Sequence, residues 1–335
     1  MHCFFCTIHA AWPWLRQTSD GCGGMGPGEG TRFVLEDKDC RARWLAVFDE
    51  PPPGARTRAP RERRVLFVTE PPEIKRYPRS YLEQFGTVIS PYPFRGVDAR
   101  ALRLENPCLN WQYGVVTGGG APVSPTLTRL GDIENLPVPR KSKKLSVICS
   151  DKTATEAQRR RIRFVRRLKE LLGDELDVFG RGFRPVADKA EAIAPYKYHL
   201  VLENNYLDNF WTEKLSDAWI GWALPLYLGA PNLAAVCEAT GGAADGFLAL
   251  DPEDEAGNME RIARCLRDNL WEERREALAR CRAWCLRHAN VFARLTALID
   301  RASPGMLRPA MLEGAETLYG TDRKAVAALY ARARR

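Results

Sequence analysis

The chain has 335 residues, which is enough for two hydrophobic cores, so its length predicts two domains. Its contents of 45% hydrophobic and 27% charged residues are those of an ordinary globular protein, and its formal net charge is +8. The longest nearly apolar run, Trp219–Pro231, contains Pro225 and is too short to cross a bilayer, which argues against a membrane-spanning helix.

The first thirty residues carry few signals. The start, MHCFFCTIHAAWPW, lacks a basic segment and a small-residue cleavage site, so we expect no secretory signal. Cys3–Ile8 is expected to form a first strand. The Gly-rich stretch Gly21–Gly30 lacks the Lys-Ser/Thr of a P-loop and the spacing of a dinucleotide fingerprint, which favours a flexible loop.

Ten cysteines are spread along the whole chain. Cys3 and Cys6 have no second Cys-x-x-Cys pair. The spacing Cys281-x3-Cys285-x2-His288 lies on a helical pattern and leaves a zinc site open, but buried thiols in a reducing compartment are the better interpretation.

A carboxylate follows an apolar strand in the first half of the chain. Val65–Thr69 has the pattern of a buried strand and ends at Glu70, before two prolines. In open parallel sheets, ligands bind beyond the carboxyl ends of the strands, so Glu70 is placed for chemistry, although a surface role is the alternative. Short strands are also predicted at Arg32–Leu35, Trp44–Phe48, Gly86–Ser90 and Tyr113–Thr117. The proline-rich region Pro122–Arg140 is predicted to be loop and linker.

The chain's excess of positive charge is concentrated after this linker. Between Lys141 and Lys169 there are eleven Lys or Arg but only two acidic residues. This segment contains a predicted strand, Leu145–Cys149, and an amphipathic helix, Thr155–Leu172. Aromatic residues do not alternate with the charges, which argues against nucleic acid. A basic wall for a diphosphate ligand, or an anionic surface, fits the pattern better.

The stretch 196–232, YKYHLVLENNYLDNFWTEKLSDAWIGWALPLYLGAPN, predicts a strand, a helix and a second, parallel strand. Tyr198–Leu202 and Leu224–Leu228 are the apolar runs, and Thr212 is the expected N-cap of the helix between them. Polar residues gather at the carboxyl edge beside the start of this helix: Glu203, Asn204, Glu213 and Lys214. A helix N-terminus favours an anion, so this edge suits a phosphorylated ligand with a polar sugar; an ordinary solvated first turn is the alternative.

Within this stretch, LENNYLDNFWTEKLSDAW and PLYLGAPN closely resemble the donor-site signature of family 10 glycosyltransferases, the α-1,3/1,4-fucosyltransferases. That signature is a Glu-Asn after a strand, then an aromatic residue and Thr-Glu-Lys, then a Pro-x-x-x-Gly turn. The similarity continues over roughly Trp12–Asp300. It implies the α/β fold called GT-B, with two Rossmann-like domains facing across a cleft. The expected ranges are 1–138 for an acceptor-binding domain, 139–302 for a GDP-fucose-binding domain and 303–335 for a basic tail.

The resemblance also implies an activity, the inverting transfer of L-fucose from GDP-fucose to a glycan hydroxyl. The expected acceptor is O3 of N-acetylglucosamine or glucose in a glycan such as a lipopolysaccharide O-antigen. A transferase for another nucleotide sugar and a non-catalytic glycan-binding protein are the two alternatives. The sequence has no Asp-x-Asp motif near the site, so no metal or other cofactor is expected, and no nucleic acid partner.

Site residues carry over from the family by position. Glu70 would be the catalytic base, and Lys214 and Arg161 would neutralise the departing diphosphate, with Arg159 and Arg160 as alternatives to Arg161. The remaining donor contacts would come from Glu203, Asn204, Phe210, Thr212 and Glu213. Members of the family often have a Tyr where this chain has Phe210, so that side chain can only pack or stack.

The last expectation concerns location and the tail. The chain lacks the membrane anchor that precedes animal relatives, which predicts a bacterial-type, cytoplasmic protein. The tail Pro304–Arg335 mixes apolar and basic residues. Two interpretations stay open for it: peripheral contact with an anionic inner membrane, or packing on the second domain.

Overall fold

A computed structural model describes residues 1–20, 30–118, 121–126, 129–152, 156–302 and 314–321. The chain divides into two compact units. The first unit is Met1–Pro107 with Val291–Arg335, and the second is Cys108–Asn290. Most of the Gly-rich stretch and most of the tail therefore lie outside the described residues. In the part of the chain that the structure describes, no helix is long and apolar enough to span a membrane.

The first unit is built on a parallel sheet with the strand order β2-β1-β3-β5-β6-β7. Every residue of β3 is buried, as is usual for a strand covered on both faces. The strands and α-helices of this unit are β1 (His2–Cys6), β2 (Arg32–Val34), β3 (Trp44–Phe48), β4 (Arg56–Thr57), β5 (Arg64–Phe67), α1 (Arg79–Leu82), β6 (Thr87–Ser90), β7 (Leu102–Leu104), α10 (Val291–Arg301) and β15 (Glu316–Thr317). Single 3-10 turns lie at Trp14–Gln17 and Arg61–Arg63.

The last described part of the chain belongs to this first unit. In α10, the ring of Phe292 lies 5.0 Å from Phe5 and 4.8 Å from Phe33. Farther on, β15 pairs with β4, and Leu318 is buried in the core of the same unit. The described piece of the predicted tail thus packs on the first unit and not on the second.

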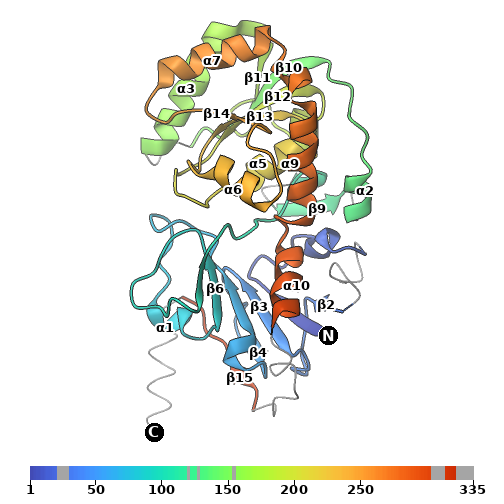
Figure 1. Ribbon diagram of the computed structural model, residues 1–335, viewed down its shortest axis with the longest axis vertical. Coiled ribbons are helices and arrows are strands. Elements are labelled where there is room, and N and C mark those ends of the chain that lie inside the picture. The colour runs from blue at the N-terminus through green and yellow to red at the C-terminus, as the bar shows by residue number, and fades with distance from the viewer. Residues whose placement is uncertain (21–29, 119–120, 127–128, 153–155, 303–313, 322–335) are drawn as a thin grey trace. The chain divides into compact units, whose positions relative to one another are not determined.

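The second unit has a parallel sheet with the order β11-β10-β12-β13-β14. Its elements are β8 (Val115–Gly118), β9 (Ala121–Pro125), α2 (Leu130–Glu134), β10 (Lys143–Ile148), α3 (Glu156–Leu172), β11 (Leu176–Phe179), α4 (Lys189–Ile193), β12 (Tyr196–Leu202), α5 (Glu213–Ile220), β13 (Leu224–Leu228), α6 (Leu233–Thr240), β14 (Leu248–Ala249), α7 (Glu255–Arg267), α8 (Leu270–Glu273) and α9 (Arg275–Arg287), with a 3-10 turn at Gly173–Glu175. Around this sheet, α3 packs beside α7, and α5 packs against α9 (Figure 1).

The strand order of the second sheet determines where a ligand-binding crevice forms in this unit. After β10, the chain forms β11, which pairs with one edge of β10. It then forms β12, which pairs with the other edge of β10. The loops that follow β10 and β12 therefore diverge and leave a crevice at the carboxyl edge of the sheet. The predicted strand, helix and parallel strand are confirmed as β12, α5 and β13. β12 ends at this edge of the sheet, and the first turn of α5 lies there.

Several predicted boundaries differ from the structure. The region predicted as linker contains β9, which forms a hairpin with β8, and α2, which packs on α9. The boundaries between the two compact units lie after Pro107 rather than at 138, and before Val291 rather than at 302. The region Glu260–Leu298 holds parts of α7 and α10 and all of α8 and α9, and the chain turns between α7 and α8 at Asn269, whose backbone is left-handed with a φ of 54°.

Candidate functional site

A cavity of about 510 Å³ lies in the crevice between β10 and β12. Ile148 to Ser150 line it from the end of β10, and Leu202 and Asn204 line it from the end of β12. The other lining residues come from α3, α4, α5, β12, the loop after β10 and the loop before β8, and they are Gln112, Lys152, Gln158, Arg161, Lys189, Ile193, His199, Leu200, Val201, Glu213, Lys214 and Asp217. The lining residues include four cations, which favours a ligand of negative charge.

Glu203 holds the first turn of α5 in place. Its side chain is fully buried, and its carboxylate accepts hydrogen bonds from the backbone N–H of Thr212 at 2.8 Å and from the Thr212 hydroxyl at 2.9 and 3.0 Å. Thr212 caps the helix, since its hydroxyl accepts from the backbone N–H of Lys214. A buried carboxylate is stable only when its oxygens are paired, and here the partners are those that start the helix.

Lys214 completes this arrangement and faces the cavity. Its ammonium lies 2.9 Å from the Thr212 hydroxyl, 3.3 Å from Glu203 and 3.7 Å from Glu213. Burial would lower the pKa of Lys214, but the carboxylates of Glu203 and Glu213 outweigh burial and raise the pKa above its ordinary value. The side chain is 27% exposed, so a charged ammonium is available to a ligand in the cavity.

Glu213 lies between two ammonium groups. Lys189 Nζ is 3.3 Å from its carboxylate on one side, and Lys214 Nζ is 3.7 Å away on the other. Burial alone would raise the pKa of Glu213, but the charges of Lys214 and Lys189 lower it to about 2. Glu213 is thus an anion at physiological pH, and it lines the cavity.

Arg161 is the arginine of α3 that meets the other predicted residues. It donates a hydrogen bond to the side-chain oxygen of Asn204, and it lines the cavity. Arg159 instead pairs with Glu156, and Arg160 donates to the carbonyl of Pro252 at 2.9 Å. Arg161 thus contacts Asn204, which is itself a predicted donor residue.

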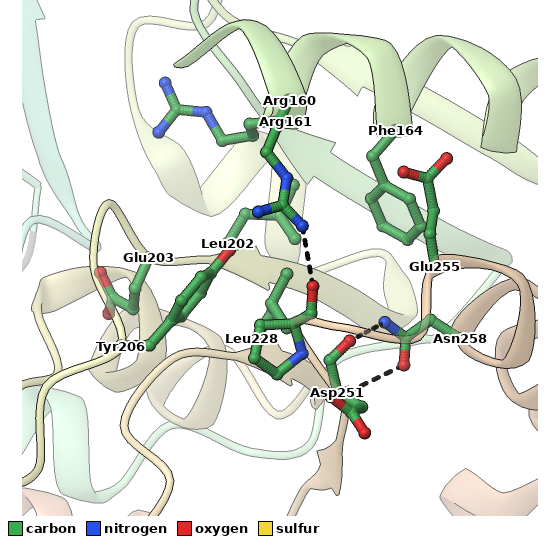
Figure 2. A pocket seen from close by; sticks show the side chains of 11 residues that line it. Arg160, Arg161, Phe164, Leu202, Glu203, Tyr206, Leu228, Asp251, Glu255 and Asn258 are labelled. Carbon is green, nitrogen blue, oxygen red and sulfur yellow. Dashed lines mark hydrogen bonds between the residues drawn. The ribbon is translucent and has the colours of Figure 1, made fainter. Parts of the chain in front are cut away.

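A second, smaller pocket adjoins the cavity and shares Arg161 and Leu202 with it. Figure 2 shows the rings of Phe164 and Tyr206 at this pocket, together with the polar residues Asp251 and Asn258. There the backbone N–H of Asp251 donates to Asn258, whose amide donates back to the Asp251 carbonyl (Figure 2). Ring faces and hydrogen-bonding edges together suit a flat, partly polar group.

Glu70 lies in the first unit, three residues after the last residue of β5. Its backbone is held by two tyrosines: its N–H donates to Tyr77 Oη at 3.3 Å, and its carbonyl accepts from Tyr92 Oη at 2.9 Å. The Tyr77 hydroxyl in turn donates to the carboxylate of Asp49 at 2.5 Å. Glu70 is partly exposed at the carboxyl edge of the first sheet, as the sequence predicted.

Six of the eight predicted site residues thus come together in the second unit. They are Arg161, Glu203, Asn204, Thr212, Glu213 and Lys214. Phe210 is buried in that unit and does not line the cavity, which agrees with a packing role. Glu70 belongs to the first unit.

Lys189, Asp217 and His199 are among the cavity residues that were not predicted from the sequence. Lys189 follows the N-cap of α4, and the capping box of Asp188 and Glu191 was a readable signal for that helix. Asp217 stands four residues after Glu213, on the same face of α5. His199 is buried in β12; burial lowers its pKa to about 3, so the imidazole is neutral. No pattern in the sequence marks it.

Among the described residues, no group of three or more His, Cys, Asp or Glu side chains is placed to hold a metal ion. The cysteines 281 and 285 are buried thiols, and Cys281 Sγ accepts from the backbone N–H of Ala243 at 3.3 Å and donates to its carbonyl at 3.2 Å.

Comparison with known proteins agrees with this geometry. Residues 138–240 match the family model for the C-terminal part of glycosyltransferase family 10 (fucosyltransferase). No curated protein sequence matches the chain. A crystal structure of an α1,3-fucosyltransferase with GDP is 15% identical, covers 93% of this chain and 91% of its own, and has a TM-score of 0.50. A structure of an α1,3-fucosyltransferase with GDP-fucose is 16% identical, with coverages of 85% and 84% and a TM-score of 0.46.

At 15% identity, the structural likeness shows the fold, and that fold is GT-B with two Rossmann-like units. The family match covers most of the segment that builds the cavity. Residues 138–240 are similar to the C-terminal part of family 10 glycosyltransferases.

Proposed function

We propose that the chain is an inverting fucosyltransferase, which transfers L-fucose from GDP-fucose to a hydroxyl group of a glycan. The observation that carries the proposal is the position of Lys214 and Arg161 on one cavity at the crevice of the second sheet. The family match of this segment and the likeness to a structure with GDP support it.

Lys214 and Arg161 would neutralise the leaving group. As the bond from fucose to the diphosphate breaks, negative charge grows on the phosphate oxygens, and fixed cations stabilise that charge without reorganisation. Lys214 is held in place by Glu203 and Thr212. Because this charge comes from side chains, we propose that transfer requires no metal ion.

Glu203 and Thr212 receive a more specific role than the sequence suggested. Both oxygens of Glu203 are already occupied by Thr212 and Lys214, so we propose that these two residues position Lys214 rather than bind the donor. Asn204 and the Glu213 carboxylate line the cavity and would contact hydroxyl groups of the donor, and Glu213 would steady positive charge on the fucose ring.

Glu70 would act as the general base that takes the proton from the acceptor hydroxyl. It is a carboxylate at the carboxyl end of a parallel strand, in the unit to which we assign the acceptor. The acceptor is proposed to be O3 of N-acetylglucosamine or glucose in a glycan such as a lipopolysaccharide O-antigen. An acceptor of that kind, made on a lipid carrier, would make peripheral contact with an anionic membrane useful.

Calorimetry with GDP-fucose, followed by a donor and acceptor screen read by product mass, tests the proposal. We expect saturable binding of GDP-fucose and a product heavier by one fucose, unchanged by a chelator. Preferential binding of another nucleotide sugar would favour a different transferase on the same fold. Glycan binding without any transfer would favour a non-catalytic protein.

A further inference from the structure

The cavity contains a row of alternating charges, of which the proposed mechanism uses only Glu213. Lys189, the first residue of α4, lies between two carboxylates of α5, with Nζ 3.3 Å from Glu213 and 3.0 Å from Asp217. The side chain of Asp217 is fully buried and that of Lys189 is 19% exposed. Glu213 and Asp217 are four residues apart on one helix, where two like charges repel each other unless a cation separates them.

Asp217 is fixed from the side opposite Lys189. Its Oδ1 accepts hydrogen bonds from the backbone N–H groups of Gln112 and Tyr113, both at 2.9 Å, while its Oδ2 accepts from Lys189. The loop before β8 therefore fixes the carboxylate of Asp217. That carboxylate fixes the ammonium of Lys189, which lies beside Glu213. Since Lys189 is also the N1 residue of a helix with a complete capping box, its backbone is held as well.

We propose that Lys189 and Asp217 are positioning residues, which hold the Glu213 carboxylate ionised and aimed at the sugar of the donor. The inference rests on the proposed function, because the role of Glu213 is defined there. It extends the site by two residues that contact Glu213 and the fold rather than the reacting atoms.

The charges around Glu213 decide what removal of Lys189 would do. They come from every element packed around the carboxylate, and they are Lys189 on α4, Lys214 and Asp217 on α5, the neutral His199 on β12, Glu203 directly after β12, and Arg161 on α3. Without Lys189, Glu213 keeps Lys214 but faces Asp217 with no cation between. Loss of an opposite charge at this distance raises a carboxyl pKa by about one to three units.

The first test is a set of variants assayed with GDP-fucose at pH 7. Lys189→Met should lower kcat by about a hundredfold, the usual result of moving a catalytic group by about 1 Å. Lys189→Arg keeps the charge and should stay within a few fold of the wild type. The double variant Lys189→Met/Asp217→Asn removes the repulsion together with the cation, so it should be more active than Lys189→Met alone. A double variant that is no better than Lys189→Met would overturn the proposal.

The second test does not depend on activity. In the wild type, the lowered pKa of Glu213 adds stability that is present above the unfolded pKa of about 4 and is lost as the pH falls. In Lys189→Met the pKa values of Glu213 and Asp217 are higher than in the wild type, so less of this stability is present at neutral pH. The difference in unfolding free energy between the two proteins should therefore be largest near pH 7 and shrink as the pH falls from about 5 toward 2.

The two tests separate the possible failures. A wild type that transfers no fucose would reject the proposed function, while the stability measurement would still decide whether Lys189 keeps Glu213 ionised. A stability difference that is the same at all pH values would show that Lys189 only packs, and it would overturn the inference even in an active enzyme.

Discussion

Lys214 is held by the same contacts that start α5. The ammonium donates to the hydroxyl that caps the helix and to the buried carboxylate that anchors this cap. Little side-chain freedom therefore remains to be lost when a ligand binds in the cavity. A flexible surface lysine would have to be ordered first, at a cost of about 0.5 to 1.5 kcal/mol.

Lys214→Ala should lower the turnover of GDP-fucose by about two to three powers of ten, as happens when one electrostatic donor to a developing anion is lost. Lys144→Ala is the matched control: it removes an exposed lysine paired with Glu175 near the amino end of β10, away from the cavity. Near wild-type turnover in Lys214→Ala would reject the leaving-group role.

Glu70→Gln should abolish transfer and leave donor binding intact. The substitution keeps the shape of the side chain and removes its basicity, and a general base contributes on the order of a hundred- to ten-thousand-fold. Glu73→Gln, an exposed carboxylate three residues later, is the control. Binding of GDP-fucose is measured by calorimetry; its loss in Glu70→Gln would assign the residue to donor binding or to the fold.

At the scale of elements, the sequence predicted those parts whose signals are local. β12, α5 and β13 follow from two apolar runs and a threonine N-cap, and all three occur where expected. The missed elements depend on distant partners. β9 contains two prolines, Pro122 and Pro125, yet it forms a strand because it pairs with β8 at an edge where lost N–H donors are tolerated.

Dependence on distant contacts also explains which features of the site the sequence could not reveal. The donor roles of Glu203 and Thr212 stay predictions, because motifs locate residues but do not reveal that the Glu203 oxygens accept hydrogen bonds from Thr212 and Lys214. The bonds from Gln112 and Tyr113 to Asp217 span more than a hundred residues, so no local pattern reveals them.

The glycine that ends the family signature has a steric reason. A Cβ on Gly229 would lie 2.2 Å from the Tyr227 hydroxyl and 2.8 Å from Cγ of Glu203. The Tyr227 hydroxyl accepts from the backbone N–H of Ala230 at 2.7 Å, so it cannot move away freely. The turn after β13 and the anchor of Lys214 are therefore packed against each other.

Gly229→Ala should destabilise the protein by about 1 to 3 kcal/mol, the usual cost of overpacking, and it should weaken GDP-fucose binding because Glu203 is displaced. Denaturant unfolding and calorimetry measure the two effects. Gly131→Ala in α2 is the control, since no atom lies within 4 Å of an added Cβ there. Unchanged stability and binding in Gly229→Ala would contradict this account of the motif.

At the scale of the whole molecule, the chain builds the first unit from both of its ends. After α9 in the second unit, α10 and β15 return to the first unit, where Leu318 is buried and Glu316 pairs with Arg64 at 2.6 Å. Sequence periodicity does not reveal this return, because an amphipathic helix fits either unit equally well. Removal of everything after residue 302 would therefore take away part of a folded unit.

The membrane hypothesis for the tail needs a truncation that respects this packing. Residues 322–335 include five Lys or Arg and one Asp, and each basic residue near an anionic bilayer contributes about 1 kcal/mol of binding. A chain that ends at Thr321 keeps β15 and Leu318 and loses only this basic segment. We expect the full chain to float with anionic vesicles at low salt and the shortened chain to remain at the bottom of the gradient.

Two controls complete the flotation experiment. Raising the salt to about 0.5 M should release the full chain, because electrostatic attraction to the bilayer is screened, and neutral vesicles should not lift it at any salt. Equal thermal stability of the two chains would show that the first unit is intact in the shortened one. Equal flotation of both chains, or of neither, would mean that this segment makes no contribution to membrane contact.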